Sequence, residues 1–173
     1  MSDFAPLIVT AELPGDLHRW ATELRRRHYP PERNHLEAHV TLFHAFPPQF
    51  RDELRSLLAR LTGESAPLPA RLEGLMSLGQ GTALKLASPA LLDLRATIAE
   101  HFHGLISAQD SHSPRLHVTI QNKVSAAEAK ALQAKLAGTV VARDFLVPGI
   151  ALHRYRGGPW EAVRRFAFRG QGR

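Results

Sequence analysis

The chain has 173 residues, with 22 Lys and Arg against 16 Asp and Glu and a formal net charge of +6. This length fits a single domain over 1–173 with a substantial core, and the basic charge suits a polyanionic partner such as RNA or a phosphorylated nucleotide. The absence of cysteine excludes disulfides, zinc-thiolate sites and thiol catalysis. Because neither a signal peptide nor a long apolar run is indicated, we expect a cytoplasmic protein that does not enter membranes and acts as a monomer.

Strands are predicted where short β-branched or alternating apolar runs are bounded by glycine or proline, and helices where apolar residues recur three or four apart. In chain order the sequence predicts a strand over 7–11, a helix over 16–27, a loop over 32–37, a strand over 38–45, a helix over 50–62, strands over 69–77 and 82–87, a helix over 89–105, a loop over 109–115, a strand that contains 117–120, a helix over 125–137, and strands over 144–155 and 160–169.

Local signals set several of these boundaries. Asp16 is a candidate N-cap of the first helix, and Gly63 is a candidate C′ residue that ends the second. The spacing of Ser125 and Glu128 matches a capping box at the start of the last helix. Glycines in the segment 79–81 allow a tight reversal, so the strands on either side should form a hairpin.

One short pattern, His-x-Thr followed by Leu or Ile, occurs twice and begins at His39 and at His117. Residues two apart in a strand point to the same face, so each copy presents an imidazole beside a hydroxyl. We expect His39 and Thr41 to face His117 and Thr119 across a cleft. Such a site could hold a tetrahedral phosphate between two imidazoles.

The order of the predicted elements has an internal symmetry if the 82–87 strand both ends one half and opens the next. Each half then contains a strand, a helix, a His-x-Thr strand, a helix and a hairpin. This arrangement predicts an α+β, bilobal fold in which two antiparallel β-sheets with pseudo-twofold symmetry face a central cleft, with helices packed on the outside. The motifs at 39–42 and 117–120 would lie one on each sheet.

The doubled motif, each copy followed by an amphipathic helix, resembles the two-histidine (2H) phosphoesterase superfamily. Within it the chain looks most like the 2′-5′ RNA ligase and RNA 2′,3′-cyclic phosphodiesterase branch. The stretch 157–168, with a glycine turn, an aromatic residue three on and spaced apolar residues, is similar to the closing hairpin of that branch. The family often has proline before each motif histidine and arginine after it, whereas this chain has Ala38 and Leu116 before, and His44 and Asn122 after, its two motifs.

The resemblance implies a phosphoesterase that opens 2′,3′-cyclic phosphate ends of RNA or nucleotides without a metal or other cofactor, and that can run the reverse 2′-5′ ligation. One motif histidine would deprotonate the attacking water while the other protonates the leaving ribose oxygen. An imidazole with an ordinary pKa of about 6.5 suits both roles. Thr41 and Thr119 would donate to the non-bridging oxygens. The residues do not say which histidine is the base.

Four further residues are candidate substrate contacts: Lys123, Phe43, Arg154 and Tyr155. Lys123 shares strand parity with the second motif and could supply the cation that binds the phosphate. Phe43 shares parity with the first motif and could stack on a base, but a packed core position is the interpretation that its residue type favours. Arg154 and Tyr155 stand near the end of a predicted strand, where they could contact the ligand or be solvated.

Two rival interpretations remain open. A metal could be bound by one of two histidine clusters, although carboxylates at ligand spacing do not accompany them. These clusters are His35, His39 and His44, and His101, His103, His112 and His117. Alternatively, the cleft is a non-catalytic module that binds RNA or a nucleotide phosphate, and it would then keep its binding when either motif histidine becomes alanine.

Overall fold

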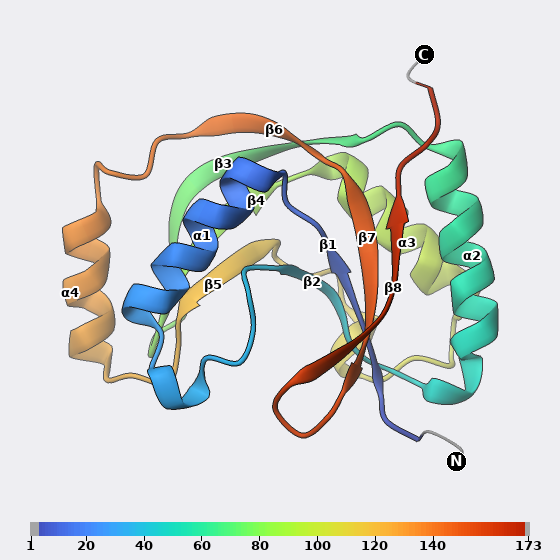
Figure 1. Ribbon diagram of the computed structural model, residues 1–173, viewed down its shortest axis with the longest axis horizontal. Coiled ribbons are helices and arrows are strands. Elements are labelled where there is room, and N and C mark those ends of the chain that lie inside the picture. Colours follow the sequence, from blue (N-terminus) through green and yellow to red (C-terminus); the bar gives the residue numbers. More distant parts are fainter. Residues whose placement is uncertain (1–3, 172–173) are drawn as a thin grey trace.

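Two four-stranded antiparallel sheets form the frame of the molecule in the computed structural model, which describes residues 4–171 (Figure 1). The first sheet has the strand order β2-β1-β7-β8, and the second has the order β5-β4-β3-β6. The strands are β1 (Leu7–Ala11), β2 (Val40–Phe46), β3 (Leu68–Ser77), β4 (Thr82–Ala87), β5 (His117–Gln121), β6 (Arg143–Val147), β7 (Gly149–Tyr155) and β8 (Trp160–Ala167). The helices are α1 (Gly15–His28), α2 (Arg51–Glu64), α3 (Pro89–His101) and α4 (Ala126–Leu136), with short 3-10 turns η1 (Pro31–Arg33), η2 (Pro48–Phe50) and η3 (Gln109–Ser111).

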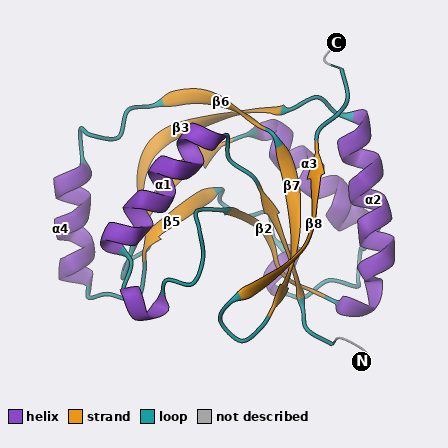
Figure 2. Ribbon diagram, in the orientation of Figure 1, coloured by secondary structure: helices purple, strands orange, loops and turns teal. Residues whose placement is uncertain are grey.

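The predicted α+β class, with one motif on each of two antiparallel sheets, is confirmed. The two motif strands, β2 and β5, are edge strands of their sheets and contact each other. Helices α2 and α4 lie at opposite ends of the molecule (Figure 2). α2 packs on β7 and β8, whereas α4 packs on β3 and β4. The motif strands therefore meet between the two helix-covered ends.

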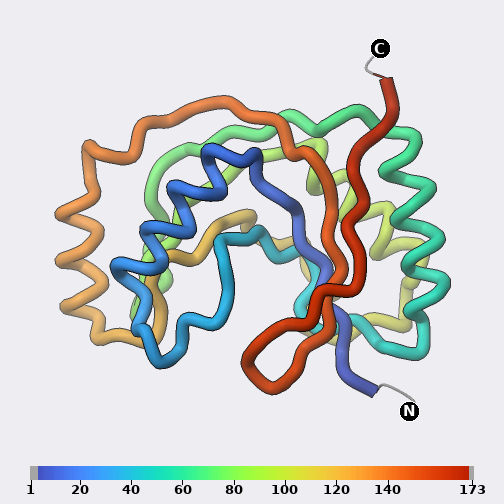
Figure 3. Tube along the Cα trace, viewed as in Figure 1, coloured from blue at the N-terminus to red at the C-terminus, as the bar shows by residue number. Residues whose placement is uncertain are grey.

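The chain crosses between the sheets at Pro148, where the sequence predicts one continuous strand over 144–155. That prediction is wrong, because β6 pairs with β3 in the second sheet whereas β7 pairs with β1 in the first. Proline has no N–H to donate to a ladder and restricts the backbone, so the apolar run divides there into two strands. The Cα trace shows this passage from β6 into β7 along the upper edge of the view (Figure 3).

Each sheet combines strands from both halves of the sequence. The β3–β4 hairpin follows the first motif but pairs with β5 of the second motif. The β7–β8 hairpin follows the second motif but pairs with β1, which in turn pairs with β2 of the first motif. Each half of the sequence thus contributes its hairpin to the sheet that holds the motif strand of the other half. Neither sheet can be assembled from one half of the chain.

Two helix ends differ from the sequence prediction. α2 continues to Glu64, so Gly63 lies within the helix, and the backbone becomes extended only at Ser65. α3 ends at His101 instead of near residue 105, because the chain turns there and Gly104 adopts a φ of 79°. Glycine takes this left-handed conformation without the steric cost that other residues meet, which favours the turn.

Of the two predicted N-caps, one is confirmed and one is wrong. The side chain of Ser125 accepts a hydrogen bond of 3.1 Å from the backbone N–H of Glu128 at the start of α4. Asp16 lies inside the first turn of α1, which begins after Pro14, and its carboxylate accepts a bond of 2.8 Å from Arg143. Its negative charge in the first turn still suits the helix dipole.

Three phenylalanines join β2 to the end of α3 in the apolar core. The ring of Phe46 meets those of Phe43 and Phe102 edge-on, with centroids 5.7 Å and 4.8 Å apart. Such edge-to-face pairs are favourable beyond the area that they bury. Among residues 4–171 no helix is long and apolar enough to cross a membrane.

Replacing Phe102 with alanine should lower the free energy of unfolding by about 3–5 kcal/mol, because the fully buried ring leaves a cavity beside Phe46. Leu105→Ala is the matched control, since its side chain is 49% exposed and should change stability by no more than about 0.5 kcal/mol. Urea denaturation measures both values. Similar small losses in the two variants would contradict the packing described for this corner of the core.

Candidate functional site

The two motif histidines make the same backbone contact. Nδ1 of His39 lies 2.8 Å from the carbonyl oxygen of Glu37, and Nδ1 of His117 lies 2.6 Å from that of Arg115. Because a carbonyl oxygen only accepts, each Nδ1 carries the proton in this bond, which leaves the lone pair on Nε2 when the ring is neutral. Both imidazoles therefore have their orientation and tautomer set by the residue two positions earlier.

A β-bulge follows the first motif threonine. Thr41 lies opposite Thr10 of β1, but Phe43 lies opposite the adjacent Val9, so Leu42 is an extra residue in β2. A bulge adds one residue to one strand and reverses the alternation of faces beyond it. Phe43 therefore does not share the face of Thr41.

The second motif has the same irregularity at the equivalent position. Thr119 lies opposite Ala83 of β4, but Gln121 lies opposite the adjacent Thr82, so Ile120 is the extra residue in β5. Gln121 turns inward as a result and accepts a hydrogen bond of 2.9 Å from the hydroxyl of Thr82. The two His-x-Thr segments thus share their ring contacts and their bulges.

Phe43 belongs to the core, so the prediction that it stacks on a base is wrong. Its ring is fully buried, and the guanidinium of Arg95 lies 4.3 Å above the ring centroid. The edge contact with Phe46 covers it further. The bulge at Leu42 is the physical reason, because it turns this side chain from the cleft to the interior.

Lys123 also departs from its predicted position. β5 ends at Gln121, and Lys123 stands exposed in the following turn with a φ of 58°. It lines a separate groove between the end of α1 and the start of α4, together with Arg27 and His28. Strand parity with the motif does not extend to a residue outside the strand, so the prediction that it clamps the phosphate loses its basis.

Arg154 and Tyr155 lie in β7 as predicted, but neither lines the cavity beside His39. The guanidinium of Arg154 is mostly buried and lies 3.2 Å from the carboxylate of Glu161 on β8. Tyr155 is exposed. Their assignment as ligand contacts therefore finds no support in the position of either side chain.

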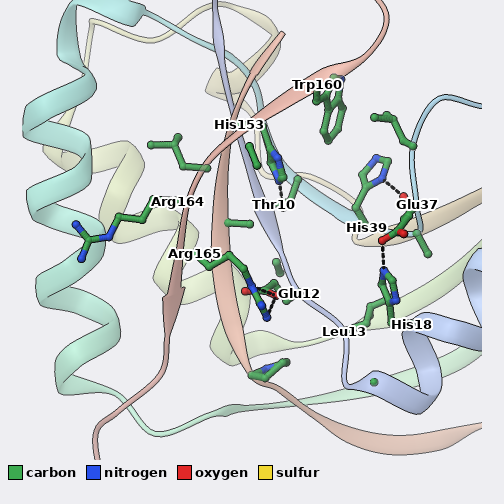
Figure 4. Close-up of a pocket in the computed structure, with 18 of the residues that line it drawn as sticks. Thr10, Glu12, Leu13, His18, Glu37, His39, His153, Trp160, Arg164 and Arg165 are labelled. Carbon is green, nitrogen blue, oxygen red and sulfur yellow. Dashed lines mark hydrogen bonds and ion pairs between the residues drawn. The ribbon is translucent and has the colours of Figure 1, made fainter. Parts of the chain in front are cut away.

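A cavity of about 900 Å³ opens beside His39 over the first sheet (Figure 4). Of the described residues that line it, His39 alone belongs to a His-x-Thr motif. Trp160 borders the cavity, with its ring centroid 4.6 Å from that of His39 and 5.4 Å from that of His153. The hydroxyl of Thr10 lies 3.3 Å from Nε2 of His153.

Sequence reasoning missed Thr10 and His153 as site residues. His153 lies beside the predicted contacts in the chain, yet only the pairing of Ile8 with His153 and of Thr10 with Ala151 puts both side chains on the cleft face of the first sheet. One feature of the sequence pointed to Trp160: it stands three residues after the first glycine of the turn in the closing hairpin. Without the strand register, that signal does not distinguish a cleft residue from a core residue.

The surroundings of His39 disfavour its charged form. Partial burial lowers the pKa of His39 to about 4, and the bond to the carbonyl of Glu37 opposes this shift. The positive charge of Arg25 lowers the pKa further, and so do His153 and His117 when they are protonated. His39 directly precedes β2, and His117 begins β5, which contacts β2.

A family model and several solved structures resemble this chain over most of its length. The sequence model of the 2′-5′ RNA ligase superfamily matches residues 13–159. The chain belongs to this superfamily. The resemblance predicted from the doubled motif is therefore confirmed, and the family of phosphoesterases and RNA ligases supports an enzyme in general terms. No curated protein matches the chain.

Solved structures share the superfamily fold along nearly the whole chain. A protein of Thermus thermophilus, TT0787, has a TM-score of 0.64 at 19% identity and covers 96% of this chain and 100% of its own. A structure described as a phosphoesterase has a TM-score of 0.63 at 17% identity, covering 98% and 100%. LigT of E. coli, in complex with 3′-AMP, has a TM-score of 0.61 at 17% identity, covering 96% and 99%. At these identities the likeness shows the fold alone.

Two polar pairs line the cavity beside His39. His18 of α1 lies 3.2 Å from the carboxylate of Glu37, and Arg165 of β8 donates a bond of 2.9 Å to Glu12 (Figure 4). Arg164 turns its guanidinium away from these residues in the same view. Across residues 4–171 no group of three or more His, Asp or Glu side chains is arranged to hold a metal ion, so the two histidine clusters considered above do not converge.

We predict that His39 stays neutral at pH 7, protonated on Nδ1, and gains its second proton only near pH 4. The unfolded chain binds that proton near pH 6.5, so His39 lowers stability progressively as the pH falls from about 6.5 towards 4. A long-range ¹H–¹⁵N NMR titration, assigned with His39→Gln, measures the ring directly. A pKa of 6.5 or above for His39 would show that burial in the site does not disfavour the charged ring.

Proposed function

We propose that the protein is a metal-independent phosphoesterase that opens 2′,3′-cyclic phosphate ends of RNA or nucleotides by general acid and base catalysis from His39 and His117. The single observation that carries this proposal is the matched bond of each Nδ1 to a backbone carbonyl. Two imidazoles prepared in the same tautomer, on adjoining edge strands, can serve the attacking and leaving oxygens of one phosphorus centre.

The reaction needs one proton to be removed and one to be supplied. A water molecule attacks phosphorus as one histidine takes its proton, and the bond from phosphorus to the ribose 3′ oxygen breaks as the other histidine protonates that oxygen. The product is a 2′-phosphate with a free 3′-hydroxyl. Each histidine could contribute a rate factor of about 10² to 10⁴.

The environment of His39 favours it as the base. Partial burial lowers the pKa of His39 and so favours the neutral ring, in which Nε2 can accept a proton. His117 then supplies the proton to the leaving oxygen. Thr41 and Thr119 are half-buried, each two residues after its histidine, and would donate to the non-bridging oxygens, where negative charge grows in the transition state.

The cavity over the first sheet supports a nucleotide as the body of the substrate. Its volume of about 900 Å³ far exceeds a phosphate group and is at the upper end of the range for small-ligand sites. Structures of E. coli LigT have been described with 3′-AMP, ATP and NADP+. By analogy with that protein, we expect nucleotides to enter here. We also propose RNA ends as substrates of a monomer that acts in the cytoplasm.

Ligation would use the same groups. The hydroxyl of a second RNA end could replace water as the attacking group and join the two ends through a 2′-5′ linkage. Microscopic reversibility requires each histidine to exchange roles between acid and base when this linkage is broken again. The balance between hydrolysis and ligation depends on whether water or an RNA hydroxyl occupies the attacking position.

We expect His39→Ala and His117→Ala each to lower kcat on a 2′,3′-cyclic-phosphate oligonucleotide by at least about 10²-fold, because each removes one proton-transfer group. His103→Ala is the matched control, since this ring is exposed in the turn after α3. Product analysis should identify a 2′-phosphate, and EDTA should leave the rate unchanged.

Other outcomes would decide between the rival functions. Activity that EDTA abolishes would favour metal catalysis. Binding of the oligonucleotide without turnover, retained in both alanine variants, would favour a non-catalytic module that binds RNA or a nucleotide phosphate. Equal turnover by the wild type and by either alanine variant would overturn the assignment of the two histidines.

A further inference from the structure

Two arginines are buried in the interior between the lobes. Arg25 of α1 and Arg95 of α3 are 3% and 4% exposed, respectively. Burial lowers the pKa of each guanidinium from its usual value, but arginine remains protonated under all ordinary conditions. A buried cation is costly unless its hydrogen bonds are satisfied, so the partners of these side chains are informative.

Arg25 binds the loop that leads into the first motif and also the strand of the second motif. Its Nε donates a bond of 3.1 Å to the carbonyl of Leu36, and Nη2 donates one of 3.2 Å to the side chain of Asn34. Its Nη1 donates a bond of 2.7 Å to the carbonyl of Thr119 in β5. The guanidinium also lies 4.4 Å above the ring of Tyr29.

Arg95 makes the reciprocal connection. Its Nε donates a bond of 3.2 Å to the carbonyl of Leu42 in β2, the strand of the first motif, and Nη2 donates to the carbonyl of Asp110. Asp110 belongs to the loop that leads into the second motif. Its carboxylate accepts bonds of 2.8 Å and 2.9 Å from the backbone N–H groups of His44 and Ala45, also in β2.

The two connections have the same form. In each, an arginine on the helix before one motif binds the approach loop of that motif and a backbone carbonyl in the strand of the other motif. Arg25 binds the carbonyl of Leu36, and the carbonyl of the next residue, Glu37, orients His39. The bond from Arg25 therefore fixes the backbone directly before the group that holds the first imidazole. No ladder of backbone hydrogen bonds joins β2 to β5 in the described part of the chain, so the separation of the motif strands needs another determinant.

We propose that Arg25 and Arg95 are a reciprocal pair of positioning residues that set the separation of His39 and His117. The effect of this pair on catalysis rests on the proposed function. A guanidinium suits the task because its planar fork presents several N–H donors to different carbonyls at once, whereas a lysine ammonium is a flexible point charge. Misplacement of a catalytic group by about 1 Å can cost about 10²-fold in rate.

The test uses Arg25→Lys and Arg95→Lys, which keep the charge and most of the volume but lose the fork. Arg143→Lys is the matched control, because Arg143 is exposed and forms an ion pair with Asp16. Each lysine variant of the pair should lower kcat by at least about tenfold per folded molecule with little change in KM, whereas the control should not. The double variant should lose less than the product of the two single effects, since both arginines act on one distance.

A second readout does not require turnover. Inorganic phosphate held between the two imidazoles should shift the NMR signals of both rings with one dissociation constant. Arg25→Lys and Arg95→Lys should each raise that constant at least about tenfold, whereas Arg143→Lys should leave it unchanged. Arg25→Met, which also removes a cation that lowers the pKa of His39, should raise the pH at which His39 titrates, whereas Arg25→Lys should not. His153 and His117 also lower the pKa of His39 when they are protonated.

The outcomes separate the two proposals. If the wild type does not turn over a cyclic phosphate but the lysine variants weaken phosphate binding, the arginine pair stands and the proposed function falls. If both lysine variants match Arg143→Lys in kcat and in phosphate binding, the positioning role is overturned. Loss of folded protein, with unchanged kcat per folded molecule and unchanged phosphate affinity, would show that the arginines only stabilise the fold.

Discussion

The site depends on the contact between two edge strands that belong to different sheets. An edge strand has backbone groups that no neighbouring strand satisfies, and these groups are usually a liability. Here the carbonyls of Leu42 and Thr119 accept hydrogen bonds from Arg95 and Arg25. The carbonyls of Thr119 and of Leu42, which follows Thr41, therefore tie the lobes together beside the two motifs.

The exchange of hairpins strengthens this connection. Each motif strand belongs to a sheet whose inner strands come partly from the other half of the sequence. The chain therefore also connects the two sheets covalently, most directly at Pro148 between β6 and β7, in addition to the side-chain bonds between the lobes. A site built from two repeats needs such a constraint, because its geometry is defined across the lobes and not within either of them.

The two motifs are alike in their local structure but not in their surroundings. Both histidines bond to the carbonyl two residues earlier, and both threonines precede a bulge. Only His39 borders the large cavity and meets the ring of Trp160. Identical groups can take acid and base roles when their environments differ. The repeated motif supplies two similar imidazoles, and Trp160 of the β7–β8 hairpin gives His39 surroundings that differ from those of His117.

Much of the fold was predictable from local patterns. The elements from β1 to α2, the β3–β4 hairpin and the cap of α4 follow from apolar periodicity and turn residues, which act over a few positions. Parity arguments failed for Phe43 and Lys123. In the first case a bulge added one residue, and in the second the strand had ended. A shift of one residue changes the face of every later side chain, and a short sequence window does not reveal it.

By itself the sequence determined most of the elements and their order, the doubled His-x-Thr motif and hence the superfamily, because these depend on residue identity and spacing along the chain. Only the tertiary structure decided that the lobes exchange hairpins, that His153 and Trp160 border the site, and that Arg25 and Arg95 reach across to the opposite motifs. Those features depend on which strands pair and in which register. Pairing between distant segments is chosen by the packing of the whole core, so no local pattern specifies it.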